Sequence, residues 1–214
     1  MRKLLMLTAV ACTLLLVAAP AGAGEDEDQA ISDEAVLTLA DLPEGWEEGD
    51  ADDDENPAEG LVRDCRDIEA ATDKADTMPR ADSPDFDDGN DPNGVTTVAN
   101  EVIVYPKAKG AKQFIKPFKA DGEECLLGRA EEAPGVIDAS IEDLDLEDFG
   151  DDGVGFTIFV TIESNGEEFT FANDILAVRV GRAVTTFAAQ NVDGPLPEGP
   201  DILATVVDRL EEAL

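Results

Sequence analysis

The chain has 214 residues, of which 50 are Asp or Glu, 15 are Lys or Arg and none is His, and its formal net charge is −35. A charge this negative excludes direct binding to nucleic acid or to an anionic membrane surface, because each needs a dense positive patch. The lack of His excludes Ser-His-Asp and Cys-His catalytic centres and argues against a zinc site. The length suits one domain that can bury a core without a metal.

The first 23 residues have the three parts of a secretory signal peptide. Arg2 and Lys3 precede an apolar stretch at 4–19, and a small-residue cleavage site ends at Ala23. A membrane anchor is the weaker alternative, because the apolar stretch is short for a span and acidic residues follow it at once. The sequence therefore predicts export to the cell envelope or the extracellular space, with no membrane span left after cleavage.

Residues 24–32 form an acidic segment without apolar periodicity, which predicts a flexible leader. A single domain is expected over 33–214. Its first element is a short helix within 31–42, where apolar side chains recur at helical spacing. A turn then presents Trp46, the only Trp, which we expect to anchor the core beside a helix.

Two acidic stretches, 47–55 and 82–94, are predicted to be exposed loops. Between them, apolar residues spaced by threes within 61–72 predict a helix that turns Cys65 toward the core. The other cysteine after the signal peptide is Cys125, and an even number of cysteines in an exported protein favours a disulfide.

Residues 95–105 are rich in Val, Thr and Ile, with valines of one parity, and predict a half-buried strand. An amphipathic helix is predicted at 108–118, and it carries a stripe of lysines. The stripe is either a counter-charge for the acidic loops or, through Lys109, Lys112 and Lys116, a docking surface for an anionic partner such as a wall polymer.

Strand patterns dominate the second half of the chain, beginning with a short strand at 136–141. An antiparallel meander is then predicted from three strands, at 154–163, 168–180 and 183–189. Asn165 and Gly166 suit the positive-φ positions of a two-residue hairpin turn, and Gly181 and Arg182 suit a second tight turn. A change of apolar parity in the middle strand predicts a β-bulge at 173–175.

An amphipathic helix is predicted at 201–214, with Asp201 as its N-cap. The fold prediction is therefore α+β: an antiparallel β-sheet meander with helices packed on one face. One disulfide, between Cys65 and Cys125, is expected to connect its elements.

No motif for catalysis or for a cofactor accompanies this fold, and neither a cofactor nor a metal is predicted. The serines lie in no G-x-S-x-G elbow, and neither glycine pattern of a phosphate-binding loop occurs. Segment 85–94 has the composition of a calcium loop, but no register places Gly and Glu where an EF-hand needs them. A hydrolase with paired carboxylates stays open, because any two acids could face a cleft.

Several features follow one another along 33–214: Leu42-Pro43 and Gly45-Trp46, Cys65, the strand 95–105 leading into a helix with Ala108, Ala111 and Phe114, then Cys125, the turn Gly181-Arg182 and the terminal helix. In this order they resemble the extracellular sensor domains of the PknH type, found at the C-termini of actinobacterial receptor Ser/Thr kinases and as free-standing exported proteins. The resemblance implies a helix-on-sheet fold with a cleft, no catalysis, and recognition of an extracellular ligand.

This sequence departs from the family pattern around its cysteines, because only one bridge is possible here. The family commonly has two disulfides and a Trp shortly before a late Cys, whereas Glu123 and Glu124 precede Cys125 here. We therefore expect an exported, monomeric, non-enzymatic ligand-binding or sensor-like module, whose partner is a small molecule or a cell-wall component. The alternatives are a carboxylate-based hydrolase acting on an extracellular polymer and an acidic cation-binding surface protein. An apolar cleft beside the helix after 95–105 would favour the binding module.

Overall fold

The computed structural model describes residues 23–49, 65–91, 96–164, 166–192 and 194–214. Residues 1–22 of the predicted signal peptide lie outside these ranges. Within the described ranges, no helix combines the length and the apolar character that crossing a bilayer requires.

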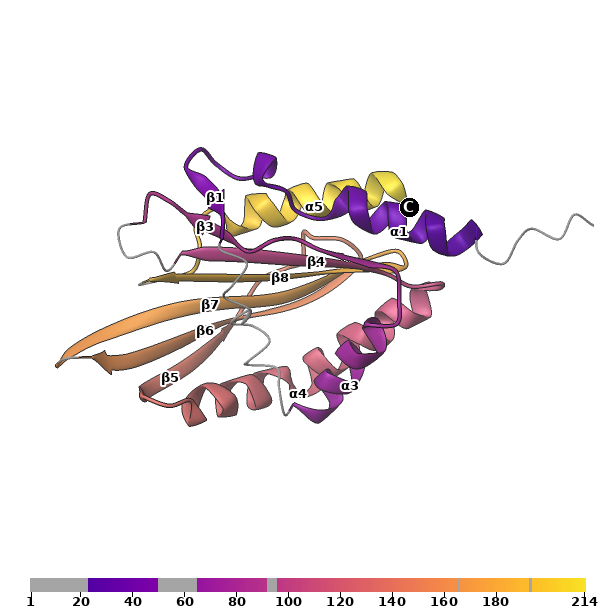
Figure 1. Ribbon diagram of the computed structural model, residues 1–214. Helices are drawn as coiled ribbons and strands as arrows, with labels where there is room; N and C mark the ends of the chain where they lie inside the picture. The colour runs from indigo at the N-terminus through magenta and orange to yellow at the C-terminus, as the bar shows by residue number, and fades with distance from the viewer. Residues whose placement is uncertain (1–22, 50–64, 92–95, 165, 193) are drawn as a thin grey trace, which may run out of the picture.

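An antiparallel sheet forms the middle layer of the molecule (Figure 1). Its strands lie in the order β1-β3-β4-β8-β7-β6-β5, and β2 pairs with β4 on the same side as β3. The strands are β1 (Trp46–Glu48), β2 (Arg80–Asp82), β3 (Phe86–Asp88), β4 (Thr97–Val104), β5 (Val136–Asp143), β6 (Asp152–Ser164), β7 (Glu167–Val180) and β8 (Ala183–Val192). The predicted α+β class and the meander of β6, β7 and β8 are confirmed.

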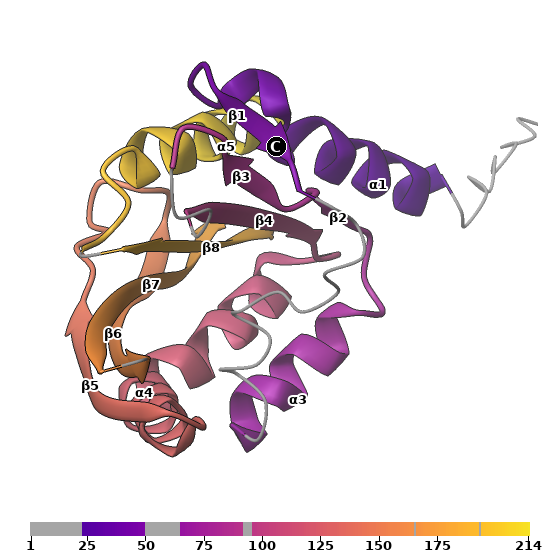
Figure 2. The ribbon, with the colours of Figure 1, turned by 60° about the vertical axis from the view of Figure 1, so that its left-hand side comes forward.

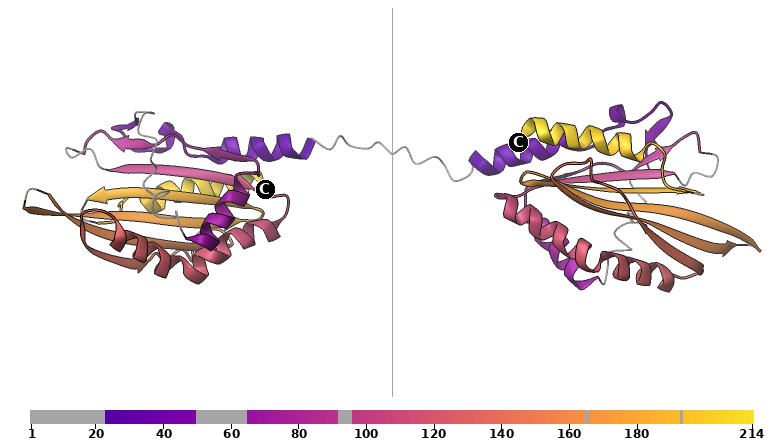
Figure 3. Two further views of the ribbon diagram at one scale, coloured as in Figure 1. Left: turned by 60° about the horizontal axis from the view of Figure 1, so that its bottom comes forward. Right: turned by 180° about the vertical axis from the view of Figure 1, so that it is seen from behind.

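Helices cover both faces of this sheet. The described helices are α1 (Ala23–Ala35), α3 (Arg66–Ala75), α4 (Ala108–Glu132) and α5 (Gly199–Ala213), with a short 3-10 turn η1 (Leu39–Asp41). In Figures 1 and 3, α1 and α5 lie on one side of the sheet, and α3 and α4 lie on the other. The predicted placement of the helices on one face is therefore corrected to a three-layer arrangement.

The central strands require this double cover, because consecutive side chains of a strand point to opposite faces. Val102 and Val104 of β4 are fully buried toward α5 and α1, in a core that includes Leu203 and Val206. Ile103, between the two valines, is equally buried toward α4. Burying such a side chain contributes about 1.5–3 kcal/mol to stability, so exposing either face to solvent would destabilise the fold.

The predicted bulge in β7 is wrong, because its pairing with β6 and β8 runs without a shift through Asn173, Asp174 and Ile175. The change of parity has another cause. Phe169 lies at the uncovered end of the strand and is 41% exposed. From Ala172 onward the strand lies between helices, so both faces of the strand include buried apolar side chains, such as Ile175 on one and Leu176 on the other.

The tight turn between β7 and β8 is confirmed. Val180 pairs with Ala183, which leaves Gly181 and Arg182 as the two-residue connection. Gly181 has φ of 55°, a conformation that glycine adopts without strain. In the other hairpin Ser164 pairs with Glu167 and Gly166 has φ of 82°, whereas position 165 lies outside the described residues.

The acidic segment predicted as a flexible leader is helical, since α1 begins at Ala23. Contacts with distant parts of the chain hold it in place. The Gln29 amide donates to the Arg80 carbonyl oxygen at 2.7 Å, and Asp28 forms an ion pair with Arg182 at 2.6 Å. Ile31 is buried in the core. The domain boundaries themselves stay a prediction.

Other element ends differ from their predictions. The segments expected to be loops contain the short strands β1 and β3, because Phe86 is fully buried beside β4. The first cysteine precedes α3 instead of lying inside it, and α4 continues past Pro117 to Glu132. Glu198 occupies the N-cap position of α5, so Asp201 lies in the first turn. Trp46 is half-buried against the core, as its anchoring role requires.

A buried asparagine connects β4 to the segment after α1. Asn100 is 4% exposed, and its side-chain oxygen accepts a hydrogen bond from the Leu37 backbone N–H at 3.1 Å. Its amide nitrogen donates to the Thr185 hydroxyl and to the Thr186 carbonyl oxygen, each at 2.7 Å. The side chain therefore satisfies polar groups from two separate segments, the residues after α1 and β8.

Replacing Asn100 with Ala should lower the free energy of unfolding by about 2–3 kcal/mol, because it leaves a buried donor and a buried acceptor without partners. Urea denaturation followed by circular dichroism measures this loss. Asn173→Ala is the matched control, since that amide makes one longer contact, of 3.4 Å, to the Ile158 carbonyl oxygen. Equal losses in the two variants would show that Asn100 has no special role.

Candidate functional site

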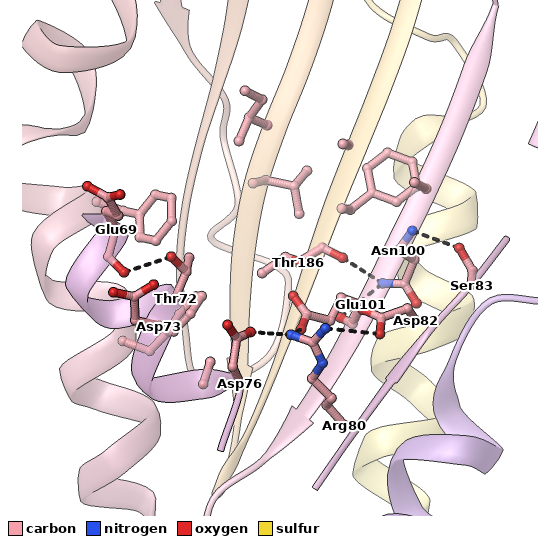
Figure 4. Close-up of a pocket in the computed structure, with 18 of the residues that line it drawn as sticks. Glu69, Thr72, Asp73, Asp76, Arg80, Asp82, Ser83, Asn100, Glu101 and Thr186 are labelled. Carbon is pink, nitrogen blue, oxygen red and sulfur yellow. Dashed lines mark hydrogen bonds and ion pairs between the residues drawn. The ribbon is translucent and has the colours of Figure 1, made fainter. Parts of the chain in front are cut away.

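A recess of about 370 Å³ is lined by residues of α3, α4 and the sheet (Figure 4). Figure 2 shows that α3 and α4 lie on the face of the sheet opposite α5. The residues of the recess come from α3, from β2 and the segment after it, and from β4, α4, β7 and β8. The recess lies beside α4, the helix that follows β4, where an apolar cleft would favour the binding module over the alternatives.

The inner wall of the recess is apolar. Ala99 and Ala188 face each other across the β4–β8 pair, and both are only half-buried. Ile175 continues the wall on β7, and α4 contributes Phe114 and Phe118, whose ring centroids lie 5.5 Å apart. The two alanines stand on the face where Ile103 and Val184, farther along the same strands, fill the space under α4. Small side chains at this point leave the hollow unfilled.

The rim of the recess is strongly acidic. It carries six carboxylates and one cation: Glu69 and Asp73 from α3, Asp76 at its C-cap, Asp82 and Asp85 from β2 and the residues after it, Glu101 from β4, and Arg80 from β2. Five of the carboxylates are exposed, and Glu101 is the one that lies deeper.

Arg80 lies among three of these carboxylates (Figure 4). Its Nη1 contacts Asp76 and lies 3.2 Å from Glu101 Oε1, and its Nη2 lies 3.5 Å from Asp82. The side chain of Arg80 is 37% exposed, so the pairs with the two exposed aspartates contribute little to stability. Their main effect is to hold the guanidinium beside Glu101.

Glu101 is the most perturbed acid of the recess. Its side chain is 23% exposed, and burial raises its pKa to about 7. The charge of Asp82 raises this pKa further, Arg80 opposes the shift, and Asp76 adds to it. Oε1 is out of contact with solvent and accepts no well-aligned hydrogen bond within the described residues. Near neutral pH this carboxyl group is therefore protonated in part of the molecules.

The raised pKa makes stability depend on pH in a defined direction. Folding raises the pKa of Glu101 from 4.5 to about 7, so the folded state holds the proton more tightly, and stability falls as pH rises through this interval. The shift corresponds to about 3 kcal/mol. In Glu101→Gln this loss should be absent, so the difference in unfolding free energy between variant and wild type should grow by that amount from about pH 5 to about pH 8.

Chemical denaturation at several pH values measures this difference. Asp138→Asn, at an exposed carboxylate of β5, is the control and should follow the wild type at each pH. Parallel pH profiles of Glu101→Gln and wild type would contradict the assignment.

The predicted disulfide is confirmed. Cys65 and Cys125 are joined, with their Cα atoms 5.9 Å apart. Cys65 immediately precedes α3 and Cys125 lies in the second half of α4, so the bond fixes the start of the recess wall to the long helix.

Replacing both cysteines with Ser should lower the free energy of unfolding by about 4 kcal/mol, the loop-closure value for a bond between residues separated by 60 positions. Guanidinium denaturation measures the loss. The wild-type protein under a thiol reductant should show a similar decrease, whereas an unchanged midpoint in both cases would contradict the expected contribution.

The lysines proposed for docking lie outside the recess. Lys109, Lys112 and Lys116 are exposed on α4, whereas Phe114 and Phe118 of the same helix face the recess and the core. The neighbouring Lys119 pairs with Asp152 at 2.5 Å, as the counter-charge interpretation expects. Docking through the three exposed lysines stays a prediction.

The acidic segment after β2 was considered for calcium. Within the described residues, no group of three or more His, Cys, Asp or Glu side chains could hold a metal ion. Asp88 accepts hydrogen bonds from the backbone N–H and the side-chain amide of Asn90, and Asp91 accepts hydrogen bonds from Thr96. Residues 92–95 of this segment lie outside the description.

Sequence reasoning missed the recess residues. Arg80 and Glu101 belong to different strands, and the acids of α3 looked like ordinary surface charges. One signal was present, because Glu101 interrupts the apolar residues of a strand that continues on both of its sides. A charged residue at such a position marks a place where the sheet is not fully covered.

No protein-family model matches the chain, and no curated protein matches its sequence. Two solved structures from Mycobacterium tuberculosis show a similar fold. The extracellular domain of PknH has 9% sequence identity and a TM-score of 0.48, over 88% of this chain and 96% of that one. LpqN, described as involved in cell envelope biogenesis, has 12% identity and a TM-score of 0.35, over 80% of this chain and 78% of that one.

Proposed function

We propose that the chain is an exported, non-enzymatic module that binds a small molecule in the recess between α3, β4 and α4. The recess carries this proposal. Its volume of about 370 Å³ falls in the range of small-molecule sites, and it combines an apolar wall with a few polar groups, as such sites do.

The arrangement of carboxylates favours binding over hydrolysis. A hydrolase with paired carboxylates needs two acids that face each other across the bond to be cleaved. Asp76, Asp82 and Glu101 instead converge on the guanidinium of Arg80. The described residues that line the recess also include neither Trp nor Tyr, the side chains that commonly form platforms for sugar rings.

Export is supported by the signal-peptide pattern and by the disulfide, which persists in oxidising compartments outside the cytoplasm. The high negative charge opposes self-association, so the module acts as a monomer. The bound molecule reaches the recess from the extracytoplasmic side, and the envelope is the place where the protein works.

Native purification from the exported fraction, followed by mass spectrometry of small molecules, tests this function. We expect one compound to accompany the wild-type protein in near-stoichiometric amount. In Ala188→Leu the larger side chain fills the recess, so the compound should be lost while the melting temperature stays close to that of the wild type.

Ala120→Leu, at an exposed position on α4, is the matched control and should retain the compound. The proposal fails if all three proteins carry the same compounds or none. Turnover of a polysaccharide by the wild type, lost in Glu101→Gln, would support the hydrolase instead.

A further inference from the structure

We propose that the recess binds a small organic cation, in which an ammonium group is attached to an apolar body, and that Glu101 is its main charged contact. This inference rests on the proposed function and adds the chemical class of the ligand. It follows from the charge of the rim, the position of one carboxylate and the nature of the inner wall.

The charge of the recess selects for a cation. Six carboxylates and one guanidinium line it, which gives a formal charge of 1 − 6 = −5. A concave site lined by one sign of charge attracts ligands of the opposite sign and repels ligands of its own. A carboxylate or phosphate ligand would meet this repulsion with only Arg80 to offset it, and Arg80 already contacts three carboxylates.

Glu101 is placed to accept an ammonium group. Its Oε1 accepts no well-aligned hydrogen bond within the described part of the chain, although Arg80 Nη1 lies 3.2 Å away. Arg80 and the Thr186 hydroxyl offset the burial of this carboxylate only in part, and an ammonium group has three further N–H donors to offer. Arg80 retains Asp76 and Asp82 when the ligand contacts Glu101, so binding leaves no buried guanidinium unpaired.

The inner wall suits the apolar part of such a ligand. Ala99, Ala188 and Ile175 offer aliphatic surface next to the carboxylate, and Phe114 and Phe118 add aromatic rings. Aromatic rings that line the same recess as the carboxylate favour ammonium groups further, through the cation–π attraction. Apolar contact with this wall therefore stabilises a bound organic cation, whereas a small hydrated ion such as Na⁺ gains nothing from it.

A metal ion is a poorer occupant. Divalent cations need several oxygen ligands that converge within bonding distance. Within the described residues no cluster of this kind is present, and a volume of about 370 Å³ far exceeds one ion. An organic cation fills the volume and needs only one close carboxylate.

Binding of this ligand should depend on pH through Glu101. The groups that face its carboxyl group are Asp76 at the C-cap of α3, Arg80 and Asp82 from β2 and Thr186 from β8, with Tyr105 just after β4. Burial raises the pKa of Tyr105, so that its hydroxyl stays neutral. Burial also raises the pKa of Glu101 to about 7, and below this pH a protonated Glu101 offers no charge to the ammonium group.

Isothermal titration with three probes that share one apolar body tests the ligand class. The probes are 2-phenylethylammonium, neutral 2-phenylethanol and anionic 3-phenylpropanoate, each at about 0.15 M ionic strength, where long-range charge effects are screened. At pH 8 the cation should bind the wild type at least tenfold more tightly than the alcohol, and the anion should not bind. At pH 5.5 the cation should lose most of this advantage.

Three variants show whether the cation occupies the recess. Glu101→Gln should weaken cation binding about tenfold and remove its pH dependence, while binding of the alcohol stays unchanged. Asp138→Asn removes one exposed carboxylate outside the recess and should bind like the wild type. Ala188→Leu keeps every charge and fills the recess, so it should lose binding; retained binding there would reveal attraction to the acidic surface alone and overturn the inference.

Other outcomes separate this inference from the proposed function. Equal binding of the cation and the alcohol, preference for the anion, or no binding of any probe at millimolar concentration overturns the cation class. The copurification experiment is independent of these probes. A neutral or anionic compound that is lost from Ala188→Leu would leave the binding function standing and refute only the ligand class.

Discussion

The central strands of the sheet bury side chains on both faces, and the arrangement of the helices follows from this constraint. α1 and α5 cover one face over a continuous apolar core. On the other face α4 lies over Ile103, Val184 and Ile158. Where Ala99 and Ala188 replace such larger side chains, the cover is incomplete. The candidate site is the part of the second interface that the core does not fill.

The incomplete cover of the sheet is also the setting in which the pKa of Glu101 is raised. A charged side chain in a strand that is elsewhere apolar lowers stability at neutral pH, and the shifted pKa is the measure of this cost. Arg80 offsets part of this loss of stability, although its guanidinium group also pairs with two exposed aspartates. Natural proteins keep such unfavourable groups mainly where they serve binding or chemistry. The disulfide compensates by fixing the α3 wall to α4.

Local features of the fold could be predicted from the sequence, and features set by distant contacts could not. The strand at 154–163 and the turn at Gly181-Arg182 depend on neighbouring residues, so their patterns gave the correct elements. The disulfide could be predicted because only two cysteines follow the predicted signal peptide. The parity change in β7 misled because a half-buried strand was assumed, whereas this strand is covered on both sides. The helix over 24–32 contacts the Arg80 carbonyl oxygen and the Arg182 side chain, and no local pattern reveals these distant partners.

The candidate site itself lay beyond sequence reasoning, because its walls come from segments spread between α3 and β8. The lysine stripe was conspicuous in the sequence, yet it lies on the part of α4 that faces away from the recess. The residues that matter were ordinary ones in isolation: two alanines, one arginine and one glutamate. Only the pairing of β4 with β8 brings Ala99 beside Ala188 and Glu101 beside Thr186.

This pairing also sets the order in which the molecule can fold. β4 is bordered on one side by β2 and β3 and on the other by β8, so the first strands join the sheet only through a strand made near the end of synthesis. Topologies dominated by such non-local pairings fold slowly. A chain emerging from the ribosome thus has no complete sheet until β8 is available. Slow closure of this kind suits the export proposed above, because a polypeptide without a complete sheet can pass through a secretion channel before its two thiols are oxidised.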